Sequence, residues 1–156
     1  MPETWAEVVG APWTETLGEA KLTFRPLSPD ELGAWDRWAQ GEHLASVATS
    51  LKGLTEEDAE SRWREAESFV SRLTLGSPRS FGAMLSSQGK LKLLQLAALA
   101  HHPSLSTSEL WSLLKTMAAL HKLWRKLLVL SGLVPEGKAE TDPHSAVLEV
   151  ARSIQL

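Results

Sequence analysis

Apolar residues are so dense between Lys90 and Ala100 that a helix formed there would be apolar on nearly every face. Such a helix is buried on all sides or lies in a membrane, and at roughly a dozen residues it is too short to cross about 30 Å of hydrocarbon. We therefore expect this helix in the core of a soluble domain. Pro103 predicts the turn after it, because the residue before a proline is pushed out of the α region.

A long amphipathic helix is predicted from Ser106 to Ser131, where apolar residues recur in steps of three and four. This inward stripe comprises Leu110, Leu113, Leu114, Met117, Leu120, His121, Trp124, Leu127, Leu128 and Ser131. Gly132 suits the position after the last turn of a helix. This long helix and the apolar helix before it would form a central αα-hairpin, which we expect to be the scaffold of the fold.

A β-hairpin is predicted near the N-terminus. Residues 13–17 and 21–25 alternate between apolar and polar side chains, and Gly18 and Glu19 lie between the two runs. Alternation with a period of two across a glycine turn is typical of a β-hairpin, here within about residues 11–26. Because a lone hairpin is marginally stable in water, we expect it to pack on the helices.

The next predicted helix has a strong start signal. Ser28, Pro29 and Glu31 form a capping box with a favoured proline at the first helical position. We expect Gly41 to end or kink this helix, with a short helical continuation as far as Lys52.

Another helix is predicted from Thr55, which caps with Asp58, to about Leu75. Residues 76–78 are expected to end this helix. One short helical turn then carries Phe81, Met84 and Leu85. A polar linker and a small amphipathic helix are expected at the C-terminus.

These elements predict a mainly α protein, a helical bundle with a central αα-hairpin and a small N-terminal β-hairpin. The 156 residues and 43% hydrophobic content suit one domain with a sizeable core. We expect residues 1–134 to form this domain and residues 135–156 to form the linker and the C-terminal helix.

Composition excludes several classes of protein. A net charge of −3 argues against a general nucleic-acid binder. The lack of Cys excludes disulfides, thiolate metal sites and Cys nucleophiles. The first residues, Met1 to Trp5, lack the basic and apolar regions of a signal peptide, so we expect the protein in the cytoplasm. The chain has no Asn and one Ile, which favours a thermophilic source, although a GC-rich genome gives the same bias.

The histidines lack the spacing of a metal site. Ligands on a helix lie three or four residues apart, whereas His101 and His102 are adjacent and point about 100° apart. His121 lies on the inward stripe, where we expect a core residue with satisfied hydrogen bonds. The sequence has no nucleophile elbow, zinc-protease motif or glycine-rich phosphate loop. We therefore expect no enzymatic activity, no metal and no cofactor.

The chain has seven Trp and no Tyr, and Trp is enriched at protein interfaces as well as in cores. Our candidates for partner binding are Trp5, Trp13, Trp111, Lys115, Lys122, Arg125 and Lys126. We expect the four cations to project together from the long helix. They could also contact nucleic acid, or simply be favoured near a helix C-terminus by the helix dipole.

Two short steps in the sequence suggest a family. The first is Arg25-Pro26-Leu27-Ser28 at the end of the predicted hairpin, and the second is Pro103-Ser104-Leu105-Ser106-Thr107-Ser108-Glu109 before the long helix. In these steps, and in the order of elements from Leu22 to Gly132, the chain resembles the tail assembly chaperones of long-tailed bacteriophages.

The resemblance implies a mostly helical, non-enzymatic protein that keeps the tape measure protein soluble and helps to recruit tail tube subunits. It implies a place in the cytoplasm of the host cell, absence from the mature virion, and possible homo-oligomers. The partner segment would bind as an amphipathic helix in a groove. The alternatives are a phage structural or head–tail adaptor protein and, with less support, a nucleic-acid-binding regulator.

Overall fold

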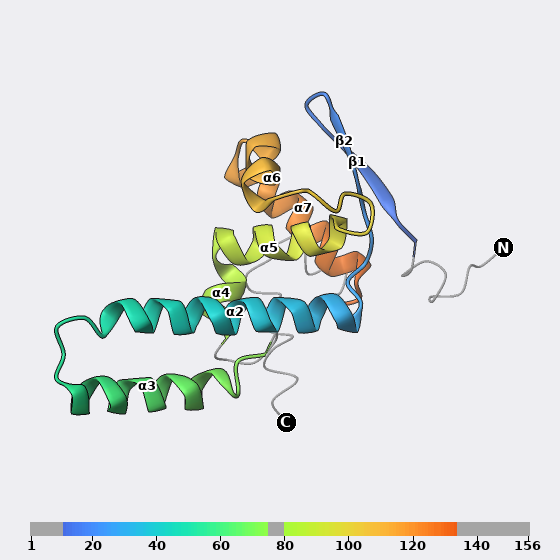
Figure 1. Cartoon of the computed structure of the whole chain (residues 1–156). Helices are drawn as coiled ribbons and strands as arrows, with labels where there is room; N and C mark the ends of the chain where they lie inside the picture. Colours follow the sequence, from blue (N-terminus) through green and yellow to red (C-terminus); the bar gives the residue numbers. More distant parts are fainter. Residues whose placement is uncertain (1–10, 75–79, 134–156) are drawn as a thin grey trace.

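The structure is a computed structural model that describes residues 11–74 and 80–133 (Figure 1). It is mostly helical with one two-stranded antiparallel hairpin, which confirms the predicted fold class. The elements are β1 (Trp13–Leu17), β2 (Ala20–Phe24), α2 (Pro29–Ser50), α3 (Glu56–Val70), α4 (Phe81–Leu85), α5 (Ser87–Ala98), α6 (Thr107–Leu114) and α7 (Met117–Leu130). The predicted C-terminal linker and helix lie outside the described residues.

The β-hairpin forms as predicted and packs on the helices. Gly18 takes a φ of +63° in the turn between β1 and β2, a conformation that glycine adopts without steric cost. Leu22 and Phe24 are buried, while the backbone N–H of Thr23 donates to His102 Nε2 at 2.9 Å. The N–H of Arg25 donates to the carbonyl of Ala97 at 3.0 Å. These two bonds fix the hairpin to the C-terminal end of α5.

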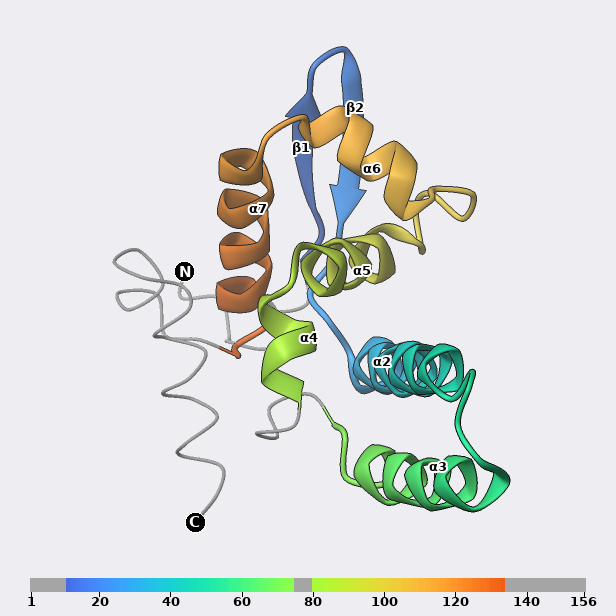
Figure 2. The ribbon, with the colours of Figure 1, turned by 90° about the vertical axis from the view of Figure 1, so that its left-hand side faces the viewer.

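Helix α5 lies at the centre of the molecule, between α2, α7 and the β-hairpin (Figure 2). Its side chains Leu93 and Leu94 are fully buried, and α7 contributes the fully buried Trp124 and Leu127. Burial of one such side chain stabilises the fold by about 1.5–3 kcal/mol. The predicted apolar helix is therefore the core element, as its all-round apolar pattern indicated.

The predicted long helix from Ser106 to Ser131 is wrong, because it is two helices. Lys115 takes a φ of +66° and ends α6, and its N–H donates to the carbonyl of Trp111 at 2.9 Å. Thr116 then caps α7, accepting the N–H of Ala119 on its hydroxyl at 3.1 Å. The apolar stripe continues across the break, so periodicity alone gave no sign of it. Met117, placed on the inward stripe by that periodicity, is instead 46% exposed.

Helix α2 also differs from its prediction, since it runs without interruption through Gly41 to Ser50. Its start is as predicted: the N–H of Ser28 donates to Glu31 Oε2 at 3.0 Å. At 22 residues it is roughly 33 Å long. A glycine weakens a helix interior by only about 1 kcal/mol, so Gly41 alone does not end this helix.

Helix α3 begins at its predicted cap, where the hydroxyl of Thr55 accepts the N–H of Asp58 at 3.2 Å. It ends at Val70, earlier than predicted, and α4 forms the predicted short turn. Helices α2 and α3 make an antiparallel pair, and its far end extends away from the rest of the described fold (Figures 1 and 2).

Candidate partner-binding surface

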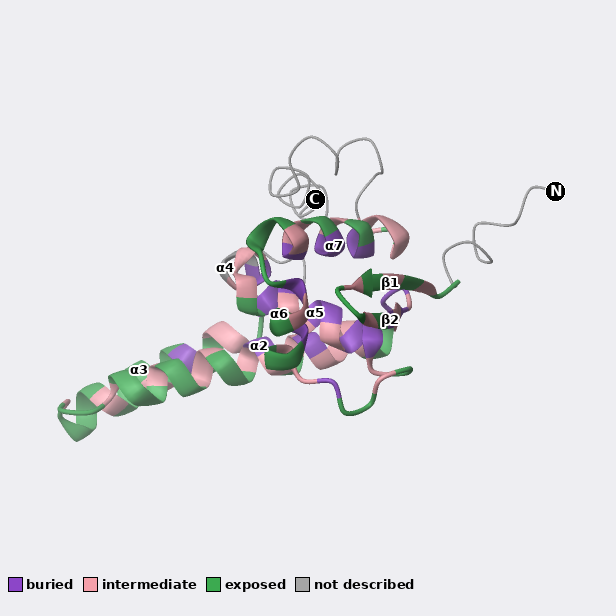
Figure 3. Ribbon diagram, turned by 90° about the horizontal axis from the view of Figure 1, so that it is seen from above, coloured by how far each residue is buried: buried purple, intermediate pink, exposed green. Residues whose placement is uncertain are grey.

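The outer part of the α2–α3 pair is weakly buried. Within α2 only Trp35 and Ala39 are buried, both in its first half, and within α3 only Ala66 is buried. Figure 3 shows the pair projecting from the body with mostly intermediate and exposed residues. The apolar side chains of Val47 and Phe69 are therefore half-buried, with part of their surface in solvent.

A first hollow of about 430 Å³ lies between the two helices. Its lining comprises His43, Val47, Ser50, Arg62, Glu65, Ala66 and Phe69. The rings of His43 and Phe69 stack with their centroids 4.4 Å apart, which joins α2 to α3 across the hollow.

A second hollow, of about 370 Å³, shares His43 and Phe69 with the first. It continues along α2 to Trp38, and Leu73 and Gln88 also line it. Trp38 lies beside the fully buried Trp35, with ring centroids 5.9 Å apart, so one face of Trp38 is supported by the core.

A third hollow, of about 190 Å³, shares Trp38 and Gln88 with the second and reaches Leu91 and Trp111. The first two hollows follow one another along α2, and the third leads from Trp38 to α5 and α6. We call them together the α2 furrow, lined along its length by Val47, His43, Phe69, Trp38 and Trp111. Apolar and aromatic side chains from α2, α3, α5 and α6 meet in it, which gives a surface suited to an apolar partner segment.

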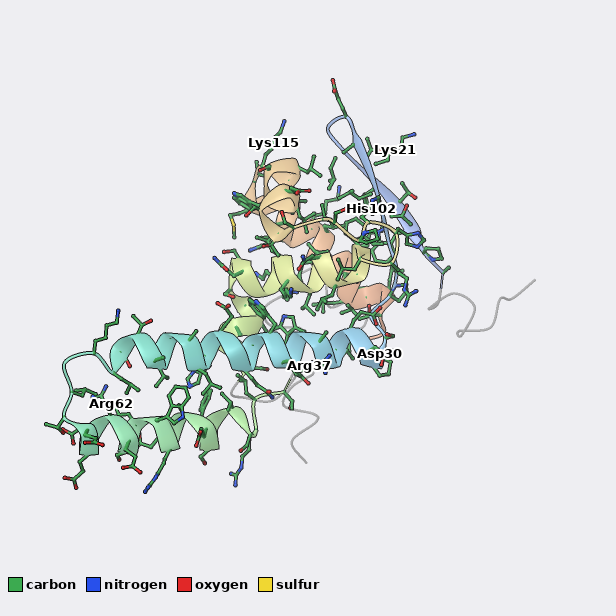
Figure 4. The ribbon with its side chains drawn as sticks, in the orientation of Figure 1. Lys21, Asp30, Arg37, Arg62, His102 and Lys115 are labelled. Carbon is green, nitrogen blue, oxygen red and sulfur yellow. The ribbon has the colours of Figure 1, made fainter. Side chains whose placement is uncertain are left out.

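Of the six selected residues that the structure describes, Trp111 lines the furrow, with 37% of its surface exposed. Lys115 is exposed at the break between α6 and α7, at the opposite end of the molecule from Arg62 of the α2–α3 pair (Figure 4). Lys122 is exposed on α7, and Arg125 is half-buried there. The four cations therefore do not project from one helix, because the break separates Lys115 from the other three.

The fold brings Trp13 and Lys126 together, but their contacts pack the hairpin against α7. The ring of Trp13 stacks on Phe24 with centroids 5.7 Å apart, and Lys126 Nζ lies 6.0 Å from the centroid of Trp13. Lys126 also forms an ion pair with Glu15 of β1. These contacts hold β1 against α7. Trp5 lies outside the described residues.

The sequence did not indicate the environment of Lys90, which is fully buried between α5 and α7. Its Nζ lies 3.0 Å from His121 Nε2 and 4.5 Å from the centroid of the Trp124 ring. Desolvation by burial lowers the pKa of Lys90 below its ordinary value of 10.5. Since no part of this side chain reaches solvent, the contact serves to join the two helices.

Within residues 11–74 and 80–133 no group of three or more His, Asp or Glu is placed to hold a metal ion. Helices long and apolar enough to cross a membrane are absent from the same part of the chain. Comparisons with family models, with curated proteins and with solved structures give no match for this chain.

Proposed function

We propose that this protein is a tail assembly chaperone of a long-tailed bacteriophage, which keeps the tape measure protein soluble and helps to recruit tail tube subunits. The observation that supports the proposal is the α2 furrow. Apolar side chains of α2, α3, α5 and α6 gather in it, and Trp38, Val47 and Phe69 are half-buried there. A groove lined by apolar and aromatic side chains suits an apolar partner segment.

The shape of the furrow suits a helical client. From Trp38 to Ser50 it follows α2 for roughly 18 Å, about three turns of a partner helix. A helix laid in such a groove buries its residues at every third or fourth position. The furrow is open along its length, so a bound segment keeps one side in solvent and can be released when assembly proceeds.

Co-expression tests the proposal. The partner is the presumed tape measure protein, the longest coiled-coil-rich protein encoded nearby. We expect it to be soluble only when this protein is present, and the two to co-purify at moderate and at high salt. Trp111→Ser should reduce the soluble fraction, whereas Met117→Ser, an exposed apolar residue outside the furrow, should not. An equally insoluble partner in both conditions would contradict the chaperone function.

Purified virions separate this proposal from the alternatives. A chaperone is absent from finished particles, whereas stable incorporation would identify a structural or head–tail adaptor protein. Salt-sensitive binding to DNA would instead favour a nucleic-acid-binding regulator.

A further inference from the structure

The two sides of the described molecule carry opposite charge. Between Pro29 and Thr74, which covers α2 and α3, there are ten acidic and five basic side chains. Between Ser87 and Leu133, which covers α5 to α7, there are five basic side chains besides the buried Lys90 and one acidic side chain. The α2–α3 pair and the α6–α7 region lie on opposite sides of α5 (Figures 1 and 2). The α2 furrow therefore lies mainly on the acidic side.

Acidic side chains also stand at the furrow itself. Glu65 of α3 lines the first hollow and Glu42 of α2 lines the second, and both are exposed. Arg62 and His43 are the basic residues among the described lining residues. Four further exposed acids, Glu56, Glu57, Asp58 and Glu60, lie in the first turns of α3. A cationic segment approaching the furrow is thus attracted before contact.

We infer that the α2 furrow binds a basic amphipathic helix, whose apolar face covers Trp38, Val47 and Trp111 and whose flanking Lys or Arg side chains face Glu42 and Glu65. The inference rests on the proposed function, since the helix would belong to the tape measure protein. It goes beyond that function because it assigns the client segment a charge as well as an apolar face.

A second copy of this chain fits the furrow poorly. Its basic helix α7 has the required charge, but the apolar residues Leu120, Leu123 and Leu127 of α7 are already buried in its own core. Helix α7 of a second copy would therefore bring cations without a free apolar face. A separate client segment supplies both.

Binding of designed peptides tests the inference. Three peptides of about 18 residues, or five helical turns, share one Leu/Ala face and differ on the other faces, which carry Lys, Glu or Gln. Fluorescence anisotropy with the full chain should show the Lys peptide binding at least tenfold more tightly than the Glu peptide. The difference should shrink as salt is raised, because exposed charges are screened.

Matched variants locate the binding. Glu42→Gln with Glu65→Gln should weaken the Lys peptide by about threefold to tenfold at low salt and leave the Gln peptide unchanged. Glu109→Gln, an exposed acid outside the furrow, is the charge control. Trp111→Ser should weaken all three peptides by about tenfold, since an aromatic residue in a groove commonly dominates binding. The control for it is Met117→Ser.

The outcomes distinguish this inference from the proposed function. Equal binding of the Lys and Glu peptides, or no effect of the double Glu variant, would overturn the inference while co-expression with the tape measure protein still tests the chaperone function. Loss of a dimer in sedimentation by Trp111→Ser would overturn it in favour of a second copy as the occupant. Selective Lys-peptide binding without any effect on tape measure solubility would support the inference and remove the chaperone function.

Discussion

At the scale of single residues, Lys90 is the ionisable group whose surroundings are most unusual. It is fully buried beside His121 and Trp124, and burial lowers its pKa below 10.5. The unfolded chain therefore keeps a proton on Lys90 at pH values where the folded chain has lost it. Between the lowered pKa and 10.5 the unfolded state binds more protons, so the free energy of unfolding contributed by this residue rises with pH.

We expect the natural protein to gain stability relative to Lys90→Met as the pH is raised from 8 towards 10.5, and the gain to level off above 10.5. Urea unfolding at several pH values from 8 upwards measures the difference. Lys122→Met, which removes an exposed ammonium group from α7, is the control. If the difference between the natural protein and Lys90→Met did not change with pH, burial would not lower the pKa of Lys90.

At the scale of elements, the break between α6 and α7 depends on one residue in an unfavourable conformation. Lys115 has a φ of +66°, where a side chain with a Cβ costs about 1–2 kcal/mol and glycine does not. Gly132 also has a positive φ, of +72°, in the turn just after α7. Lys115→Gly should therefore raise the free energy of unfolding by about 0.5–1 kcal/mol.

The reciprocal substitution Gly132→Lys should lower the free energy of unfolding by about 1 kcal/mol. Nothing lies within 4 Å of the position of an added Cβ at Gly132, so the cost comes from the backbone conformation alone. Chemical unfolding of both variants checks the pair. If Lys115→Gly is destabilising, α6 and α7 prefer to merge when the strain is removed, and the break is held by contacts elsewhere.

The same break shows what the sequence could predict. Caps at Ser28 and Thr55 and the turn at Gly18 were predicted because each depends on a few adjacent residues. Thr116 is a favoured N-cap residue, but the apolar periodicity continues across it. The positive φ of Lys115 has no such local signal and depends on the packing of α6 and α7 against α5.

The candidate surface was predicted only in part for a similar reason. Trp111 was selected because it lies off the inward stripe, and it lines the furrow. Trp38 and Phe69 were not among the candidates, and their half-burial depends on how far α3 and α6 reach along α2. The furrow joins residues from several elements distant in sequence, so no single stretch contains its pattern.

At the scale of the whole molecule, the described fold divides into a well-packed centre and a thinly packed projection. Helix α5 has seven buried residues, whereas α3 has one and α2 has none after Ala39. Local opening requires little free energy where few apolar contacts are lost. We therefore expect amide hydrogens of α3 and of the second half of α2 to exchange through local opening, well before those of α5 and α7.

Hydrogen exchange measured by mass spectrometry checks this expectation and connects it to function. Addition of the Lys-rich peptide should protect the segments around Val47 and Phe69, because a helix in the α2 furrow buries both sides of the hollow. Protection of α7 instead would place the peptide on the basic side. Uniformly slow exchange across α2, α3 and α5 without peptide would mean that the projection is held as firmly as the core. If α2 and α3 do not open locally, the furrow would bind its client as a preformed helix, with no movement of α3.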